Sequence, residues 1–171
     1  MVEDIANKTN ITEDRTEEAI DTLSKFTVSC LSALEPYDAH STLMWAHYAN
    51  FHMGICIEYN TTDIIDSLKK IPAGKGDDSP LIMLLPVQYE HAPVSKNVYI
   101  ENTIIDMFYK QSQWSYEHEW RIMLHSMESI VVKPAKIWFG CRCKNETQNV
   151  YKYLCEKHSI STESVEDKLF I

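Results

Sequence analysis

Short strand-like segments alternate with amphipathic helical patterns along this chain of 171 residues, without the regular rhythm of a parallel strand–helix–strand fold. This order is typical of α+β proteins. We therefore predict a single compact domain that has a mixed or antiparallel sheet of short strands with flanking helices. The predicted strands cover residues 26–32, 54–59, 81–89, 119–124, 130–132, 137–139 and 168–171. The predicted helices cover residues 12–25, 42–51, 61–70, 97–113 and 144–158.

The length suits one domain with its own hydrophobic core. We expect residues 1–11 to be loosely ordered and residues 12–171 to form the domain. Residues 72–80, which contain two glycines and two prolines, form the clearest predicted loop. Proline 86 interrupts the strand pattern of residues 81–89 and predicts a bend or an edge strand there.

Charge and targeting signals narrow the classes of partner. The net charge of −9 argues against non-specific binding to nucleic acid. No apolar run has the length of a membrane span, and the acidic N-terminus has no secretory pattern. The odd number of cysteines, five, is typical of a reducing compartment, so we expect a cytoplasmic protein without a membrane partner.

The densest polar motif covers residues 113–121, which read Gln-Trp-Ser-Tyr-Glu-His-Glu-Trp-Arg. If this segment enters a strand, alternation places Glu117, Glu119 and Arg121 on one face and Trp120 on the other. Two interpretations remain open. Arg121 neutralises Glu119 within a sheet, or the two carboxylates act on a bound ligand. In the second interpretation, the ligand also contacts Trp114 and Tyr116.

A second dense motif is Met44-Trp45-Ala46-His47-Tyr48-Ala49. On a helix, Met44, His47 and Tyr48 share a face, so His47 and Tyr48 are candidates for ligand binding together with Trp45. The alternative is that these residues pack in an aromatic core. We predict one site formed by this helix and the strand that holds Glu117 and Glu119.

Metal binding has little support in the sequence. The seven histidines show no zinc-ligand spacing, and Cys141-Arg142-Cys143 is too tight for the common zinc pattern. We therefore predict no metal ligands of that kind. We expect Cys30, Cys56 and Cys155 to lie in the core as small apolar residues.

Six segments carry a family resemblance: residues 26–32, 43–49, 54–59, 85–89, 110–121 and 137–140. Together they resemble an uncharacterised bacterial family, the domain of unknown function DUF2971. They follow the family's order over about residues 26–171, and the two tryptophan-centred motifs are the most specific. The resemblance implies that a family segment normally found before residue 26 is missing. An exposed strand edge that pairs in a homodimer, or with that missing segment, is then expected.

Glu117-His118-Glu119 also resembles the Glu-x-Glu motif of ADP-ribosyltransferases, where it precedes a strand. This second resemblance implies NAD as a substrate, with Glu119 as the catalytic acid and Glu117 on the acceptor side. Ser32 lies in the segment that loosely matches the Ser-Thr-Ser strand of that class. The resemblance implies that the NAD-anchoring arginine of that class would lie in the segment expected to be missing before residue 26.

These features are compatible with three functions. The first is an NAD-consuming effector or defence protein, in which Glu117, Glu119 and Arg121 form the catalytic row. The alternative is a non-catalytic module that binds a small nucleotide ligand or a partner protein. The third is a nuclease-like effector in which Glu58, Glu117 and Glu119 hold Mg²⁺.

Overall fold

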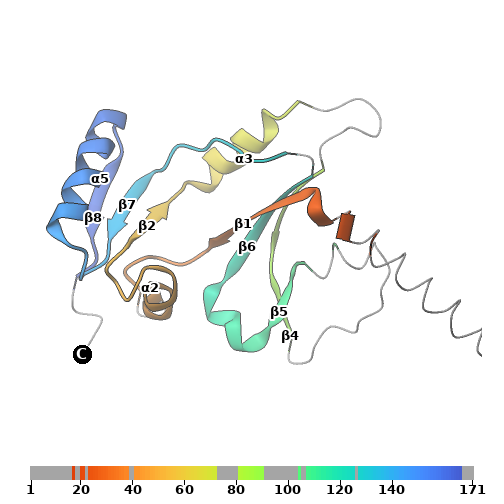
Figure 1. Cartoon of the computed structure of the whole chain (residues 1–171), viewed down its shortest axis with the longest axis horizontal. Helices are drawn as coiled ribbons and strands as arrows, with labels where there is room; N and C mark the ends of the chain where they lie inside the picture. The colour runs from red at the N-terminus through yellow and green to blue at the C-terminus, as the bar shows by residue number, and fades with distance from the viewer. Residues whose placement is uncertain are drawn as a thin grey trace, which may run out of the picture. The chain divides into compact units, whose positions relative to one another are not determined.

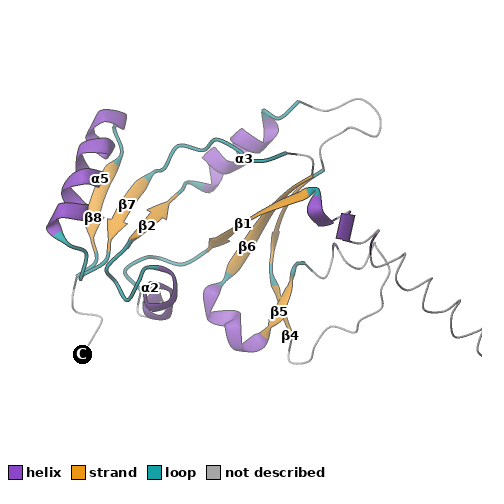
Figure 2. Cartoon of the chain, viewed as in Figure 1, coloured by secondary structure: helices purple, strands orange, loops and turns teal. Residues whose placement is uncertain are grey.

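The computed structural model describes residues 17, 20–21, 23–38, 41–72, 81–90, 104, 107–125 and 127–166. The chain divides into two compact units. The first unit comprises residues 1–32 and 73–129, and the second comprises residues 33–72 and 130–171. Both units combine short strands with helices, so the predicted α+β class is confirmed (Figure 2).

The first unit is built on a three-stranded antiparallel sheet with the order β1-β6-β3 (Figure 1). Strand β6 (Glu119–His125) lies in the centre, between β1 (Phe26–Ser32) and β3 (Ile82–Pro86). The run Ile122-Met123-Leu124 is buried on both faces of the sheet, which is why a continuous apolar run becomes the central strand. The predicted strand at residues 26–32 is confirmed over its whole length.

Register assigns the side chains of this sheet to two faces. Glu119 lies opposite Ser32, and Arg121 lies between Cys30 and Leu85, so all of these share one face. Trp120, opposite Leu31 and Pro86, points to the other face. Cys30 is exposed because β1 lies at the edge of the sheet, so its predicted place in the core is wrong.

Strand β3 ends at Pro86, where the sequence predicted a bend or an edge strand. The chain continues into β4 (Gln88–Glu90), which pairs in parallel with β5 (Tyr109–Gln111). The predicted helix over residues 97–113 is therefore wrong at β5, and its first residues lie outside the described part of the chain. The 3-10 helix η3 (Ser112–Glu117) follows directly after β5. His118 takes a left-handed conformation, with φ 44°, and turns the chain into β6.

The second unit has the sheet order β2-β7-β8. Strand β7 (Lys136–Phe139) pairs antiparallel with β2 (Ile55–Glu58) and parallel with β8 (Ser161–Ser164). Helix α5 (Asn145–His158) connects the two parallel strands, as parallel pairs require. Helices α2 (Thr42–Tyr48) and α3 (Thr61–Lys69) flank β2 in the sequence, close to where the helical patterns predicted them.

Three details of the second unit differ from the sequence predictions. Residues 130–132 form no strand, and Val131 is exposed. Strand β8 was not predicted because Ser-Thr-Glu-Ser has no apolar alternation, while the predicted strand at residues 168–171 lies outside the described residues. The sequence pattern of α5 predicts an apolar stripe of Val150, Tyr151 and Leu154, but Val150 and Leu154 are exposed, and the buried residue of the helix is Cys155.

Two small apolar clusters form the core of the second unit. Trp45 and Trp138 pack together with Ala49 and Val165. Phe139 packs with Ile137, Cys143 and Cys155. The predicted core position of Cys155 is confirmed, and Cys56 is partly buried against the first cluster.

Candidate functional site

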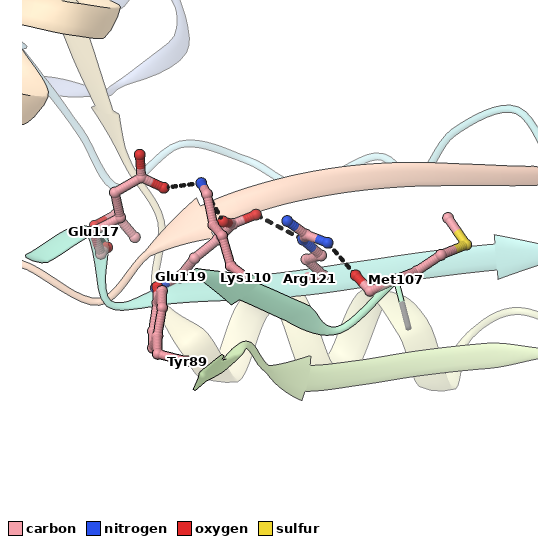
Figure 3. A network of polar contacts seen from close by, with 7 residues as sticks. Tyr89, Met107, Lys110, Glu117, Glu119 and Arg121 are labelled. Atoms are coloured by element: carbon pink, nitrogen blue, oxygen red, sulfur yellow. Dashed lines mark hydrogen bonds and ion pairs between the residues drawn. The ribbon is translucent and has the colours of Figure 1, made fainter. Parts of the chain in front are cut away.

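Four charged side chains meet in the first unit, and we call them the ion network: Lys110, Glu117, Glu119 and Arg121 (Figure 3). Lys110 comes from β5, Glu117 from the end of η3, and the other two from β6. The Nζ atom of Lys110 donates to Glu117 Oε2 and, at 3.0 Å, to Glu119 Oε2. Arg121 Nε donates to Glu119 Oε1 at 2.7 Å. Each oxygen of Glu119 therefore accepts a hydrogen bond from a different cation.

The ion network is largely shielded from water. The side chains of Glu117 and Glu119 are 3% and 6% exposed, whereas those of Lys110 and Arg121 are 23% and 17% exposed. Buried carboxylates require partners that replace their hydration. Two cations and two anions balance within the network, so the motif is electrically neutral as a unit.

Strand alternation explains only half of this arrangement. Glu119 and Arg121 share a face of β6, as predicted, and the interpretation that Arg121 neutralises Glu119 is confirmed. Glu117 does not continue that row, because it lies in η3 and is separated from β6 by the left-handed residue His118. Its carboxylate is joined to Glu119 by Lys110 instead. Sequence reasoning missed Lys110 because its place depends on the parallel pairing of β5 with β4, for which no local pattern exists.

Backbone and hydroxyl groups fix the ion network in place. Arg121 Nη1 donates to the carbonyl of Met107, and the backbone N–H of Glu119 donates to the hydroxyl of Tyr89 at 2.9 Å. Ser32 Oγ donates to the carbonyl of Glu117. Ser32, a predicted ligand residue, thus lies beside the predicted pair of acids and anchors the end of η3 to β1.

The ion network holds Glu119 in its ionised form. Burial by itself would raise the pKa of this carboxyl. The hydrogen bonds from Arg121, Cys30 and Lys110 outweigh that effect and lower the pKa to about 2. The pKa of Lys110 is raised: its burial opposes the charge, but hydrogen bonds to Glu117 and Glu119 prevail. Glu119 therefore cannot supply a proton near neutral pH, and it can act only as an anionic acceptor.

Acid should remove the stabilisation that the ion network provides. The pKa of an unfolded glutamate is about 4.3, and that of folded Glu119 is about 2. Since the folded value is the lower one, the contribution is complete above about pH 4.3 and is lost as the pH falls toward about 2, with a total on the order of 3 kcal/mol. We expect the unfolding free energies of wild type and Glu119→Gln, measured in urea, to converge over this window. A difference that stays constant would contradict the assignment.

Two half-buried aromatic rings lie next to the ion network. Lys110 Nζ is 5.1 Å from the centroid of the Trp114 ring, a distance suited to a cation–π interaction. The Trp114 and Tyr116 rings are tilted at 39° with centroids 6.1 Å apart. The structure therefore brings six of the predicted site residues together: Ser32, Trp114, Tyr116, Glu117, Glu119 and Arg121.

The remaining predicted site residues lie in the second unit. Trp45 is 3% exposed, and its Nε1 atom donates to the carbonyl of Pro36 at 2.7 Å, which favours the core-packing interpretation for this residue. His47 and Tyr48 are exposed, with ring centroids 6.4 Å apart. Because these residues and the ion network belong to different units, a single site that contains both sets stays a prediction.

The described residues contain neither a cluster of metal ligands nor a helix that could span a membrane. Within the described residues, no group of three or more His, Cys, Asp or Glu side chains is arranged to hold a metal ion. Glu58, the third carboxylate of the nuclease hypothesis, belongs to the second unit and accepts a hydrogen bond from Trp138 Nε1 at 2.6 Å. None of the described helices has both the length and the apolar character that crossing a membrane requires.

Residues 44–122 match the family described as "Protein of unknown function (DUF2971)". The match begins in α2 and ends in β6, so it includes the whole ion network, and it confirms the resemblance inferred from the motifs over these residues. The family's description assigns no activity. Comparison with curated proteins and with solved structures gave no match.

Proposed function

We propose that the first unit is a non-catalytic module that binds a nucleoside-containing ligand beside the ion network. The observation that carries this proposal is the contact between Lys110 and the half-buried Trp114 ring, directly next to two buried, cation-paired glutamates. Stacking surface, a cation and anionic acceptors are the three groups that recognise a base, a phosphate and a ribose.

The aromatic pair would supply most of the affinity. A planar base stacked on an aromatic side chain gains about 1–3 kcal/mol, and it does so with little regard for base identity. Trp114 and Tyr116 lie close enough for one planar ring to contact both. This supports a ligand with a flat heterocycle. Specificity for one base would then depend on the neighbouring polar groups.

The ion network would supply orientation. A carboxylate has about four lone-pair sites, and Glu119 uses three of them for Arg121, Lys110 and the thiol of Cys30. The fourth suits a ribose hydroxyl, and hydrogen bonds to an ionised carboxylate are the stronger kind. Lys110 uses two of its three N–H donors for Glu117 and Glu119, and its third suits a phosphate oxygen.

The charge balance favours binding over NAD cleavage. In the transferase mechanism, a glutamate must face the positive charge that develops on the ribose. Here both oxygens of Glu119 already face Arg121 and Lys110, whose charges cancel the field that the reaction needs. The NAD-consuming interpretation therefore requires one of these cations to be displaced when the substrate binds.

The test is a titration of the purified chain with NAD and, separately, with adenosine, followed by ligand-observed NMR. We expect saturable binding that Trp114→Ala weakens at least tenfold, because the stacking surface is removed. Trp120→Ala is the matched control: Trp120 is 39% exposed but points to the opposite face of β6. Equal binding by the Trp114→Ala and Trp120→Ala variants would contradict the proposed surface.

The same samples separate binding from catalysis. A module that only binds gives unchanged ligand spectra over hours. Release of nicotinamide by wild type, lost in Glu119→Gln, would replace the binding proposal with the NAD-consuming one. Absence of binding to either compound would contradict both.

A further inference from the structure

The outer edge of β1 is a second feature of the first unit, independent of the proposed ligand site. β1 lies at one edge of the sheet, and no strand among the described residues pairs with its outer side. An unpaired edge presents a row of N–H and C=O groups that can bond to another strand. Seven residues make β1 as long as the central strand β6.

Hydrogen bonds of β6 identify which groups of β1 point outward. The carbonyl of Glu119 accepts from Val87, and the N–H of His125 donates to Leu81, so the odd-numbered residues of β6 bond toward β3. Its even-numbered residues then bond toward β1, where their partners are Thr27, Ser29 and Leu31. The alternate residues of β1 direct their backbone groups away from the sheet; these are Phe26, Val28, Cys30 and Ser32.

Other edges of the two sheets carry features that discourage pairing. At the opposite edge of the same sheet, the outward positions of β3 include Pro86, which has no N–H to donate. The edge strands of the second unit, β2 and β8, have four residues each and contain Glu58 and Glu163. In contrast, β1 contains neither a proline nor a charged residue. Natural sheets protect exposed edges with such residues, so the lack of protection singles out β1.

From these features we infer that β1 is a dimerisation surface, which pairs antiparallel with β1 of a second copy of this chain about a two-fold axis at Ser29. This register overlaps all seven residues and matches outward-pointing residues with one another. Phe26 lies opposite the second copy's Ser32, and Val28 lies opposite the second copy's Cys30. Four hydrogen-bonded pairs result, with about eight backbone hydrogen bonds.

Side chains are compatible with this pairing. Because β1 contains no charged residue, no like charges face each other across the two-fold axis. Phe26 of the second copy comes to lie opposite Ser32. On the other side of β1, Ser32 lies opposite Glu119 of β6. Each copy would thus place an aromatic ring next to the other copy's ion network. One strand pair buries less than the roughly 1,200 Å² of a standard interface, so we expect a reversible dimer.

The first experiment is sedimentation velocity of the whole chain over a range of concentrations. We expect wild type to pass from monomer to dimer as the concentration rises. Val28→Pro removes an outward N–H without touching a bond to β6, so it should weaken the dimer at least tenfold, whereas Val28→Thr keeps the N–H and should behave as wild type. A wild type that stays monomeric at millimolar concentration would overturn the inference.

Disulfide formation tests the register and does not depend on the folding of the proline variant. Ser29 lies on the axis, where opposite Cα atoms are about 4.5 Å apart, within the range of a disulfide. A Cys30→Ser/Ser29→Cys variant should therefore form a covalent dimer on mild oxidation. The control, Cys30→Ser/Thr27→Cys, should not, because the two residues at position 27 would be about 13 Å apart along the strands. Equal cross-linking in both variants, or none in the first, would overturn this pairing.

Discussion

Glu119→Gln should lower the free energy of unfolding by about 2–4 kcal/mol near neutral pH. The substitution keeps the shape of the side chain but removes the anion that Lys110 and Arg121 share. A glutamine can accept from Arg121, but its amide N–H₂ then faces the donor Nζ of Lys110. Breaking a buried ion pair costs about 3–5 kcal/mol. We expect somewhat less here, because Lys110 retains Glu117 and both cations are partly exposed.

Urea denaturation of matched variants tests this prediction. Asp66→Asn removes the partner of Lys69 in an exposed pair and should change the free energy of unfolding by less than about 1 kcal/mol. In the double variant Glu119→Gln/Arg121→Gln, one cation is removed together with the anion, so the loss should be smaller than the sum of the two single losses. Additive losses would mean that Arg121 and Glu119 do not act as a pair.

Gly140→Ala should strongly destabilise the second unit. A Cβ atom at Gly140 would lie 2.1 Å from the carbonyl oxygen of His52 and 2.6 Å from its carbonyl carbon. The neighbour is backbone, and it has little freedom to move. His52 ends a run of three left-handed residues, and its carbonyl accepts a hydrogen bond from Arg142 N at 3.1 Å. We expect a loss of more than about 3 kcal/mol, beyond the usual cost of overpacking.

Gly54→Ala is the matched control for this steric effect. Its Cβ atom would lie 3.1 Å from the carbonyl oxygen of Ala49, which a shift of a few tenths of an ångström relieves. We expect a loss of about 1 kcal/mol. Thermal unfolding followed by near-ultraviolet circular dichroism, which reports the packing of Trp45 and Trp138, measures both variants. Similar losses in the two would show that the close contact at Gly140 relaxes without cost.

Local pattern predicted the elements well wherever side-chain periodicity agreed with burial. The alternation in residues 26–32 and the apolar run in residues 122–124 each identified a strand. The predicted helices at residues 61–70 and 144–158 correspond to α3 and α5. The local sequence pattern did not predict β5 and β8. Their short polar sequences form strands only because a neighbouring strand supplies their hydrogen bonds.

The sequence identified most residues of the candidate site but not all of the contacts between them. The spacing of Glu119 and Arg121 was enough to predict an ion pair between them, since residues two apart share a face of a strand. Nothing local indicated that Lys110 would pair with both glutamates. Together with the hydrogen bonds from Arg121 and Cys30, that contact keeps Glu119 ionised, which is why we propose binding rather than acid catalysis.

The sequence by itself determined the α+β class, the positions of most helices and strands, and the pairing of charges along β6, because each depends on residues a few positions apart. Tertiary structure alone decided that β6 lies in the centre of its sheet and that β1 lies at an edge. It also decided that Lys110 closes the ion network and that Gly140 lies against His52. These contacts join residues distant in sequence, and their energies depend on burial and register, which no local pattern encodes.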